Sequence, residues 1–427
     1  SSTESRTEPR TVYLPPTNGM AHRSSLSPDG KQLLVVEMGS TGEQGGYGWL
    51  PCRVTPFDGS SSGKPVGPAP AQCTDAAWSP DGKWMYFSAN TGGGFHIWRQ
   101  RFPDGTPAQV TFGATEEEGI HFAPDGRSFV TSIGSRQSTV WIHDASGDRQ
   151  LTSEGFAFFP TVSPDAKKLY YLVQAGGARN FVTGRLWVAD LESGQHQRLL
   201  PDFQLQHYTI SADGQRVVFV ALDGAGRTPV WLSVLNGRTA PRRLTTMDAR
   251  AAFFGAPGEV VFAGEGDFVY RVKDDGSELQ KIIPAPMLHL FGVSPDGRWV
   301  PAAEGAIPDK RNELVVYPTG GGLPTLICKC YPPQPIDIGP RPPYLSWTPN
   351  GRFLYLTFIA STYAIPLQPG QLLPPIPASG FQSKEAVAAL PGARLISDER
   401  VFPGPNPSIY AFMKVAAQRN IYRVPVP

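Results

Sequence analysis

Four of the seven histidines occupy comparable places in the chain, each a few residues before a short polar turn. Imidazole changes its charge near neutral pH and is a common metal ligand, so histidines at matched positions could bind a metal ion or an anionic ligand. The alternative is that these positions tolerate mid-sized polar side chains beside trapped water. The four residues are His22, His121, His207 and His289.

Charged residues near these histidines and in the longer loops complete a candidate binding surface. Uneven loops on a rigid scaffold are where binding residues usually lie. We expect long loops at 38–48, 173–185, 221–228, 304–312 and 331–343, and we expect the triple Glu at 116–118 in a link between two sheets. For any single residue of this kind, the alternative is an ordinary solvated rim. The candidate ligand-binding residues are Arg23, Asp75, Glu118, His121, Arg179, His207, Arg250, His289 and Arg341.

The sequence contains no motif that predicts catalysis. Ser61 in GSSSG fits the Gly-X-Ser-X-Gly pattern, but a nucleophile elbow needs a strand before it and a helix after it, and the small polar neighbours indicate a turn. The same stretch lacks the first Gly and the final Ser or Thr of a phosphate loop, because Asp58 and Pro65 stand there. The motif set of a protein kinase is missing too. We therefore predict a protein that is not an enzyme and has no cofactor and no resident metal.

The turns that follow these histidines belong to a repeat that organises the whole chain. SPDGKWMYFSAN at 79–90 has relatives with the same turn and the same apolar strand after it, and a degenerate copy begins at Gly255. A spacing near 45 residues is the length of one four-stranded blade of a β-propeller. The other copies begin at residues 27, 123, 163, 211, 294 and 348.

The turn chemistry explains why the same residues recur. Proline fixes φ at the second turn position, aspartate bonds its own backbone, and glycine accepts a left-handed conformation. The fourth copy has Ala166 where the others have glycine. We expect that alanine to cost about 1 kcal/mol.

The predicted fold is an all-β, closed β-propeller of four-stranded blades, with nine blades or, as the alternative, eight. RTVYLPP at 10–16 is interpreted as a strand that completes the last blade, beside the final strands at 408–415 and 420–427. Residues 1–9 are expected to be disordered, and 10–427 to form a single domain. SKEAVAALPG at 383–392 predicts a short helix near 383–390 on the rim, because it has a serine cap, good helix formers and a Pro-Gly stop.

Composition excludes several classes of function. The formal net charge of +1 provides no long-range field for nucleic acid or an anionic membrane surface. No apolar run approaches the roughly 20 residues of a membrane helix, so we expect no direct membrane insertion. The chain begins at Ser1 without Met, which suggests a processed form or an excised segment.

Four cysteines are compatible with two disulfides in an exported protein. Cys52 and Cys73 flank a predicted hairpin, which suits a bridge. Cys328 and Cys330 could close a small ring or remain free thiols.

The SPDGK turn followed by an apolar strand, at Ser27, at Ser79 and with arginine at Ser294, resembles the TolB-like, WD-type propeller repeat. The resemblance extends from about residue 10 to residue 427. The repeat style, the closing QRNIYRVPVP and the lack of an appended enzyme domain also look like the extracytoplasmic sensor propeller of some bacterial membrane-anchored serine/threonine kinases.

The resemblance implies a periplasmic or extracellular sensor or scaffold that binds a small molecule, a glycan or a protein without catalysis. It also implies a membrane-linked kinase domain in the same full-length protein. The alternatives are a periplasmic assembly protein similar to TolB and a propeller lyase or hydrolase that uses the channel mouth.

Overall fold

The computed structural model describes residues 10–15, 19–40, 47–92, 94–113, 115–153, 155–174, 183–304, 313–330, 344–397 and 399–426. The chain is all-β and is built from antiparallel, mostly four-stranded sheets of the kind that form propeller blades, which confirms the predicted fold class. It divides into two compact units, which are described separately: unit 1 comprises Ser1–Arg136, Gly176–Asn180 and Ala416–Pro427, and unit 2 comprises Gln137–Ala175 and Phe181–Val415. The number of blades and the single domain over 10–427 stay predictions, and the segment 1–9 lies outside the described residues.

The repeated turn joins the first two strands of successive sheets, as predicted. In the copy at Ser79, the serine hydroxyl donates to Asp81 Oδ1 at 2.6 Å and accepts the backbone N–H of Trp84 at 2.9 Å. Gly82 has a φ of +69°, the left-handed conformation that the turn requires. The same serine–aspartate bond recurs at Ser163 and Ser294. The repeat is therefore a locally encoded hairpin that starts a sheet each time it occurs.

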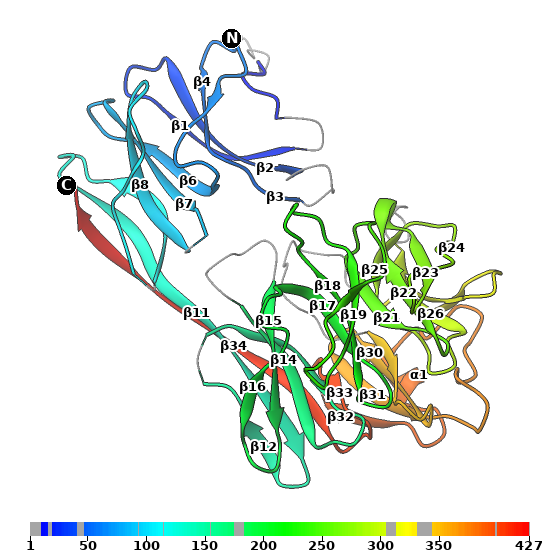
Figure 1. Cartoon of the computed structure of the whole chain (residues 1–427). Helices are drawn as coiled ribbons and strands as arrows, with labels where there is room; N and C mark the ends of the chain where they lie inside the picture. Colours follow the sequence, from blue (N-terminus) through cyan, green and yellow to red (C-terminus); the bar gives the residue numbers. More distant parts are fainter. Residues whose placement is uncertain are drawn as a thin grey trace, which may run out of the picture. The chain divides into compact units, whose positions relative to one another are not determined.

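Unit 1 contains three sheets, and its elements are labelled in Figure 1 where there is room. The first sheet has β1 Met20–Leu26, β2 Gln32–Ser40, β3 Tyr47–Trp49, β4 Arg53–Pro56 and β5 Lys64–Pro65. The second has β6 Gln72–Trp78, β7 Trp84–Asn90, β8 Phe95–Arg101 and β9 Ala108–Gln109. The third begins with β10 Glu116–Phe122 and continues into β11 Ser128–Asp144.

Unit 2 contains five successive meanders of four strands in its described residues. They are β13 Ala157–Val162, β14 Lys168–Gln174, β15 Gly184–Asp190 and β16 His196–Arg198; β17 Leu205–Ile210, β18 Arg216–Ala221, β19 Val230–Val234 and β20 Arg242–Arg243; β21 Ala251–Phe254, β22 Glu259–Ala263, β23 Val269–Lys273 and β24 Gln280–Ile283; β25 Met287–Leu290, β26 Trp299–Glu304, β27 Leu314–Pro318 and β28 Thr325–Cys328; and β29 Leu345–Trp347, β30 Phe353–Phe358, β31 Ser361–Pro366 and β32 Arg394–Ser397. A single pairing, Gly184 with Leu205, links the first meander to the second.

Two long strands contribute to both units. β34 Tyr410–Pro425 pairs with β11, and the two strands run side by side in Figure 1. In unit 1 the last part of β34 completes the sheet of β10 and the first part of β11. In unit 2 the first part of β34 joins β33 Phe402–Pro403, the last part of β11 and β12 Gly147–Gln150 in one sheet. The sequence predicted two C-terminal strands, at 408–415 and 420–427, whereas the structure has the single continuous strand β34 there.

The predicted closing strand at 10–16 is wrong. Residues 10–15 belong to no strand, and they lie along the first sheet, where Arg10 donates to the Asp58 carbonyl and the Tyr13 hydroxyl donates to Glu37 Oε2 at 2.5 Å. The partner of the C-terminal strand is β11. Pro15 has no backbone N–H to donate to a neighbouring strand, which makes this segment a poor partner in a sheet. β11, in contrast, is about as long as β34 and can pair with it along its length.

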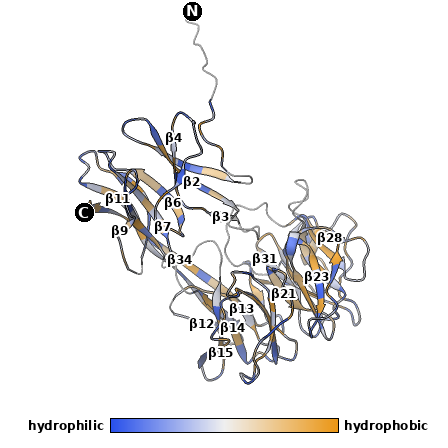
Figure 2. Ribbon diagram, turned by 45° about the horizontal axis from the view of Figure 1, so that its top comes forward, coloured by the Kyte–Doolittle hydropathy of each residue, from blue (hydrophilic) through white to orange (hydrophobic). Residues whose placement is uncertain are grey.

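The cores lie between neighbouring sheets. Figure 2 shows hydrophobic residues along the strands of both units, and the largest fully buried side chains are aromatic, as with Phe87 and Phe129 in unit 1 and Phe219 in unit 2. The predicted helix is present as α1 Lys384–Ala388, with the Ser383 hydroxyl accepting the Ala386 N–H at 3.3 Å. A short 3₁₀ turn spans Glu265–Asp267.

The four cysteines form two disulfides, Cys52–Cys73 in unit 1 and Cys328–Cys330 in unit 2. The bridge expected between Cys52 and Cys73 is confirmed, and of the two alternatives left open for Cys328 and Cys330 the small ring is the one that forms. The two cysteines of the first bridge are 21 residues apart in the sequence, and those of the second bridge are 2 residues apart.

Candidate functional site

A pocket in unit 1 brings together several of the predicted ligand-binding residues. Its cavity volume is about 560 Å³, and its wall includes Arg23, Glu118 and His121 from that prediction. We call it the unit 1 pocket. Other residues of its wall are His22, Trp49, Val130 and Ile421.

The pocket is built on the innermost strand of each sheet in unit 1. β1 carries Arg23, β6 carries Asp75 and β10 carries Glu118 and His121. Each strand has an irregularity of pairing register at that point, between Ala21 and Arg23, between Cys73 and Asp75, and between Glu118 and His121. A β-bulge bends a strand and redirects its side chains, and bulges are common beside binding sites. The three irregularities explain why polar side chains of inner strands reach this pocket.

Asp75 connects two of these strands from behind the pocket. Its Oδ2 accepts the Ile120 N–H at 2.7 Å and its Oδ1 accepts the Ala76 N–H at 3.0 Å. Burial raises the pKa of this carboxyl, while the backbone bond from Ile120 and the charge of Arg23 act against that rise. The Arg23 Nη1 atom is 3.7 Å from Asp75 Oδ1, too far for a hydrogen bond. Asp75 therefore positions β10 and Arg23 with both of its oxygens already occupied.

Glu118 is held by an arginine from the C-terminal strand. Arg419 Nη2 lies 3.4 Å from Glu118 Oε2, and Arg419 Nε donates to Ser132 Oγ at 3.1 Å. The backbone carbonyl of Glu118 accepts the Thr131 hydroxyl at 3.2 Å. Gly134 leaves room for this arrangement, because a Cβ there would lie 2.2 Å from the Gln418 carbonyl oxygen. One wall of the pocket thus depends on β34.

Three donor-bearing side chains of the pocket have no hydrogen bond within the described residues: Arg23, His22 and His121. The Arg23 side chain is 63% exposed, and both histidines are exposed. The His22 ring lies 4.9 Å from the Trp49 ring, centroid to centroid, and makes no polar contact there. Glu118 is thus paired with Arg419, whereas Arg23, His22 and His121 keep donors that make no hydrogen bond within the described residues.

The triple Glu lies in β10 and not in a link between sheets, so that prediction is wrong. Strand alternation sends Glu117 to the other face, where it is buried and its Oε2 lies 3.0 Å from His96 Nδ1 and accepts the Thr111 hydroxyl at 2.7 Å. Glu116 and Glu118 remain on the face that Arg419 reaches.

The other predicted residues do not join the unit 1 pocket. In unit 2, His207 Nδ1 accepts the Ala252 N–H at 3.3 Å, its ring lies 4.7 Å from that of Phe253, and burial lowers its pKa to about 4. Arg250 pairs with Asp267 at 2.5 Å. His289 lies on β25, directly after another register shift. Arg179 and Arg341, and most of the long loops, at 41–46, 175–182, 305–312 and 331–343, lie outside the described residues.

Sequence reasoning missed Trp49 and Ile421 as pocket residues, and it missed Arg419 as the partner of Glu118 and Ser132. No local signal in the sequence places Arg419 or Ile421 beside β10. Among the described residues, His, Cys, Asp and Glu side chains form no group of three that could hold a metal ion.

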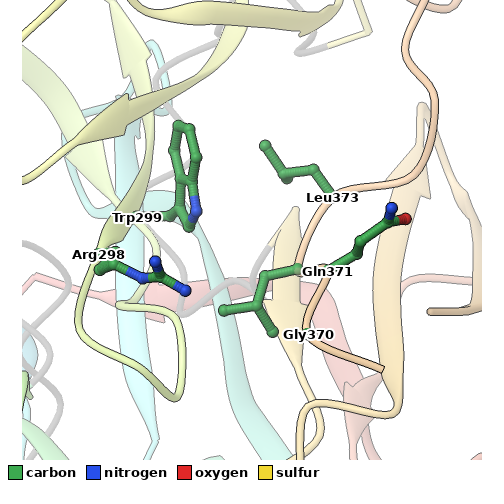
Figure 3. Close-up of a pocket in the computed structure, with 6 residues that line it drawn as sticks. Arg298, Trp299, Gly370, Gln371 and Leu373 are labelled. Carbon is green, nitrogen blue, oxygen red and sulfur yellow. The ribbon is translucent and has the colours of Figure 1, made fainter. Parts of the chain in front are cut away.

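A second, smaller pocket of about 300 Å³ lies in unit 2 (Figure 3). It is lined by Arg298, Trp299 and the loop 370–373, which is fixed by a bond of 2.6 Å from Trp347 Nε1 to the Leu372 carbonyl. The guanidinium of Arg298 already pairs with Asp296. Its arginine, unlike Arg23, is therefore hydrogen-bonded, and the pocket provides a control for the unit 1 pocket.

No family model matches this chain, and no curated protein does. Solved structures similar to it include TolB from Acinetobacter baumannii, at 14% identity over 69% of this chain and 76% of that one, with a TM-score of 0.39. Another is oligogalacturonate lyase from Vibrio parahaemolyticus, at 17% identity over 76% of this chain and 93% of that one, with a TM-score of 0.36. A third is a putative TolB from Agrobacterium tumefaciens, at 20% identity over 64% and 83%, with a TM-score of 0.27. The fold class follows from the strand order and register of this chain and not from these similarities.

Proposed function

We propose that this chain is a non-catalytic recognition protein and that its ligand binds in the unit 1 pocket. The observation that carries the proposal is the convergence of Arg23, His22 and His121, all without hydrogen bonds in the described structure, on one cavity of about 560 Å³. That volume is within the range of small-molecule sites, which combine apolar walls with a few convergent polar groups.

The hydroxyl groups of the pocket favour recognition over nucleophilic catalysis. A nucleophile needs a base within hydrogen-bond reach. Ser132 accepts from Arg419, Thr131 donates to the Glu118 carbonyl, and Thr74 bonds Ser88 Oγ at 3.1 Å. These hydroxyls are thus engaged in positioning the inner strands, and none of them is bonded to a histidine.

The same proposal places the protein outside the cytoplasm. Two disulfides are typical of an oxidising compartment. Among the described residues, no helix has the length and apolar character needed to cross a bilayer. The finer part of the proposal, in which occupancy of the pocket is passed to a membrane-linked kinase domain, has its support in the resemblance of the repeat.

The test is to expose the protein to a pool of small metabolites and to identify by native mass spectrometry what stays bound. Wild-type protein is compared with His121→Ala and Ile421→Asp, which change exposed positions of the pocket wall, and with Arg298→Gln in the second pocket. We expect at least one compound to bind the wild type and Arg298→Gln and to be lost from both unit 1 variants.

Retention by all four proteins would contradict the proposed site. Release of a chemically altered compound by the wild type would contradict the non-catalytic assignment and favour a propeller enzyme.

A further inference from the structure

The free donors of the unit 1 pocket carry information on the chemistry of its ligand. A polar group that loses water on binding must regain a hydrogen bond or cost free energy. Among the described residues, the guanidinium of Arg23 makes no hydrogen bond, and the rings of His22 and His121 make none either. A ligand that enters this pocket without satisfying these groups would therefore bind poorly.

The carboxylates at the pocket and behind it already have partners. Both carboxylate oxygens of Asp75 accept backbone N–H groups. Glu118 pairs with Arg419 at 3.4 Å. A cationic or purely donor ligand would have to displace these bonds, whereas a ligand with acceptor oxygens finds donors ready.

The net charge of the site does not favour an anion, since the three carboxylates of Asp75, Glu116 and Glu118 stand against the two guanidinium groups of Arg23 and Arg419. The preference has to come from geometry: three donor groups, on β1 and β10, open to one cavity. Arginine presents a planar fork of N–H groups that matches carboxylate, sulfate and phosphate oxygens.

The rest of the wall indicates what the oxyanion is attached to. Ile421 is 71% exposed and Val130 is 36% exposed, and both border the pocket beside the Trp49 indole. Exposed apolar side chains next to unfilled donors form an amphiphilic surface. Such a surface suits a compact apolar or ring-shaped body that carries one charged end.

We propose that the ligand of the unit 1 pocket is an organic oxyanion, a carboxylate or a phosphate on a compact apolar or aromatic body. Its charged end binds Arg23 with His22 and His121, and its body contacts Trp49, Val130 and Ile421. This inference rests on the proposed function and adds the ligand class to it.

The experiment uses matched probes on the full chain and measures affinity by ligand-observed NMR. Benzoate and benzamide share a ring and differ in charge, phenyl phosphate replaces the carboxylate with a phosphate, and inorganic phosphate has no apolar body. We expect benzoate or phenyl phosphate to bind at least about tenfold more tightly than benzamide. The comparison of the two anions tells a carboxylate ligand from a phosphate ligand.

Variants test which residues create the preference. Arg23→Gln should remove the advantage of the acid over the amide, and Arg298→Gln should keep it. Because Arg23→Gln also removes the ion pair with Asp75, His121→Gln is the second variant and should lower the affinity for the acid by about threefold.

Ile421→Asp, which removes an apolar contact and adds no donor cation, separates this inference from the proposed function. Equal binding of benzoate and benzamide, lost in Ile421→Asp, would leave the proposed site standing and overturn the oxyanion assignment. If inorganic phosphate binds as tightly as phenyl phosphate, the ligand gains nothing from an apolar body, and that part of the inference is wrong. No binding of any probe would overturn both the inference and the site.

Discussion

Two histidines with equivalent places in the repeat, His121 in unit 1 and His207 in unit 2, have opposite surroundings. Each directly follows a register irregularity in an inner strand. His121 is exposed in a pocket without a hydrogen bond in the described structure, whereas His207 accepts the Ala252 N–H and lies against Phe253. The irregularity is the constant feature, and the neighbouring side chains decide whether it opens a site or supports packing.

Arginines show the same contrast. Arg23 in unit 1 is mostly exposed and 3.7 Å from its only ion-pair partner among the described residues, while Arg250 in unit 2 contacts Asp267 and donates to the Met287 carbonyl at 3.3 Å. Residue type and repeat position are thus insufficient to define a site. The proposal of a recognition site in unit 1 therefore rests on the state of each group's hydrogen bonds.

The largest expected effect comes from Gly134→Ala, which should damage unit 1 and spare most of unit 2. The new Cβ would lie 2.2 Å from the Gln418 carbonyl oxygen and 2.7 Å from Arg419 Cα, and neither backbone atom can move without breaking the pairing of β11 with β34. We expect a loss of about 4 kcal/mol in the opening free energy of unit 1. Hydrogen exchange of peptides from β10 and β18 measures the two units separately.

Gly224→Ala is the control, because nothing lies within 4 Å of its Cβ. Equal protection of β10 in Gly134→Ala and in the wild type would show that the C-terminal strand does not stabilise this sheet.

The second comparison removes one disulfide at a time. All four cysteines are almost fully buried, so the double alanine variants leave similar cavities and differ mainly in the loop that the bridge closes. Loop closure predicts a loss of about 3 kcal/mol for Cys52→Ala/Cys73→Ala and about half of that for Cys328→Ala/Cys330→Ala. Urea unfolding of the three proteins checks the order, and a larger loss for the short loop would be inconsistent with this account.

Local chemistry explains what could be predicted from the sequence. The repeated turn, the short helix with its Ser383 cap and the strand order within most sheets depend on residues that are near neighbours in the chain. The partner of 416–425 depends on contacts nearly 300 residues apart, and the glycine at 134 does not identify Gln418 as its neighbour. The pocket was only partly predicted for the same reason. His121 was found by its place in the repeat and Arg23 as a charged neighbour of His22, whereas Glu118 was chosen on the wrong expectation of a link between sheets. Arg419 and Ile421 belong to the strand whose partner was predicted wrongly.

A third, smaller effect concerns pH and His207. Burial lowers the folded-state pKa of His207 from 6.5 to about 4. Between these values the unfolded chain binds a proton that the folded chain does not, so stability falls as the pH drops through this window. His207→Gln should reduce the free energy of unfolding that unit 2 loses at acidic pH by about 1 to 2 kcal/mol. The effect is kept to this size because the ring is partly exposed.

Urea unfolding at pH 7 and pH 4.5 measures that difference, with His143→Gln on the surface of unit 2 as the control. The same pH dependence in His207→Gln and wild type would mean that another group causes the acid sensitivity.

The smallest effect compares the repeat turns of the two units directly. Ala166 in unit 2 adopts a φ of +59°, and Gly82 occupies the equivalent place in unit 1 at +69°. An alanine in the left-handed conformation costs the folded state about 1 kcal/mol relative to a glycine. Replacing it by glycine recovers only part of that free energy, because glycine also gives the unfolded chain more conformational freedom. Ala166→Gly should therefore stabilise unit 2 by about 0.5 kcal/mol.

The reciprocal change, Gly82→Ala, should destabilise unit 1 by a similar or slightly larger amount. A Cβ at Gly82 would meet only Pro28 at 3.6 Å, an ordinary contact, so the backbone conformation alone sets its cost. The two substitutions must therefore shift the unfolding midpoints in opposite directions when each unit is followed by hydrogen exchange. Shifts of the same sign would show that the turns of the two units are not energetically equivalent, although they are alike in sequence and φ. The repeat could then no longer be treated as a common scaffold on which only the inner-strand side chains differ.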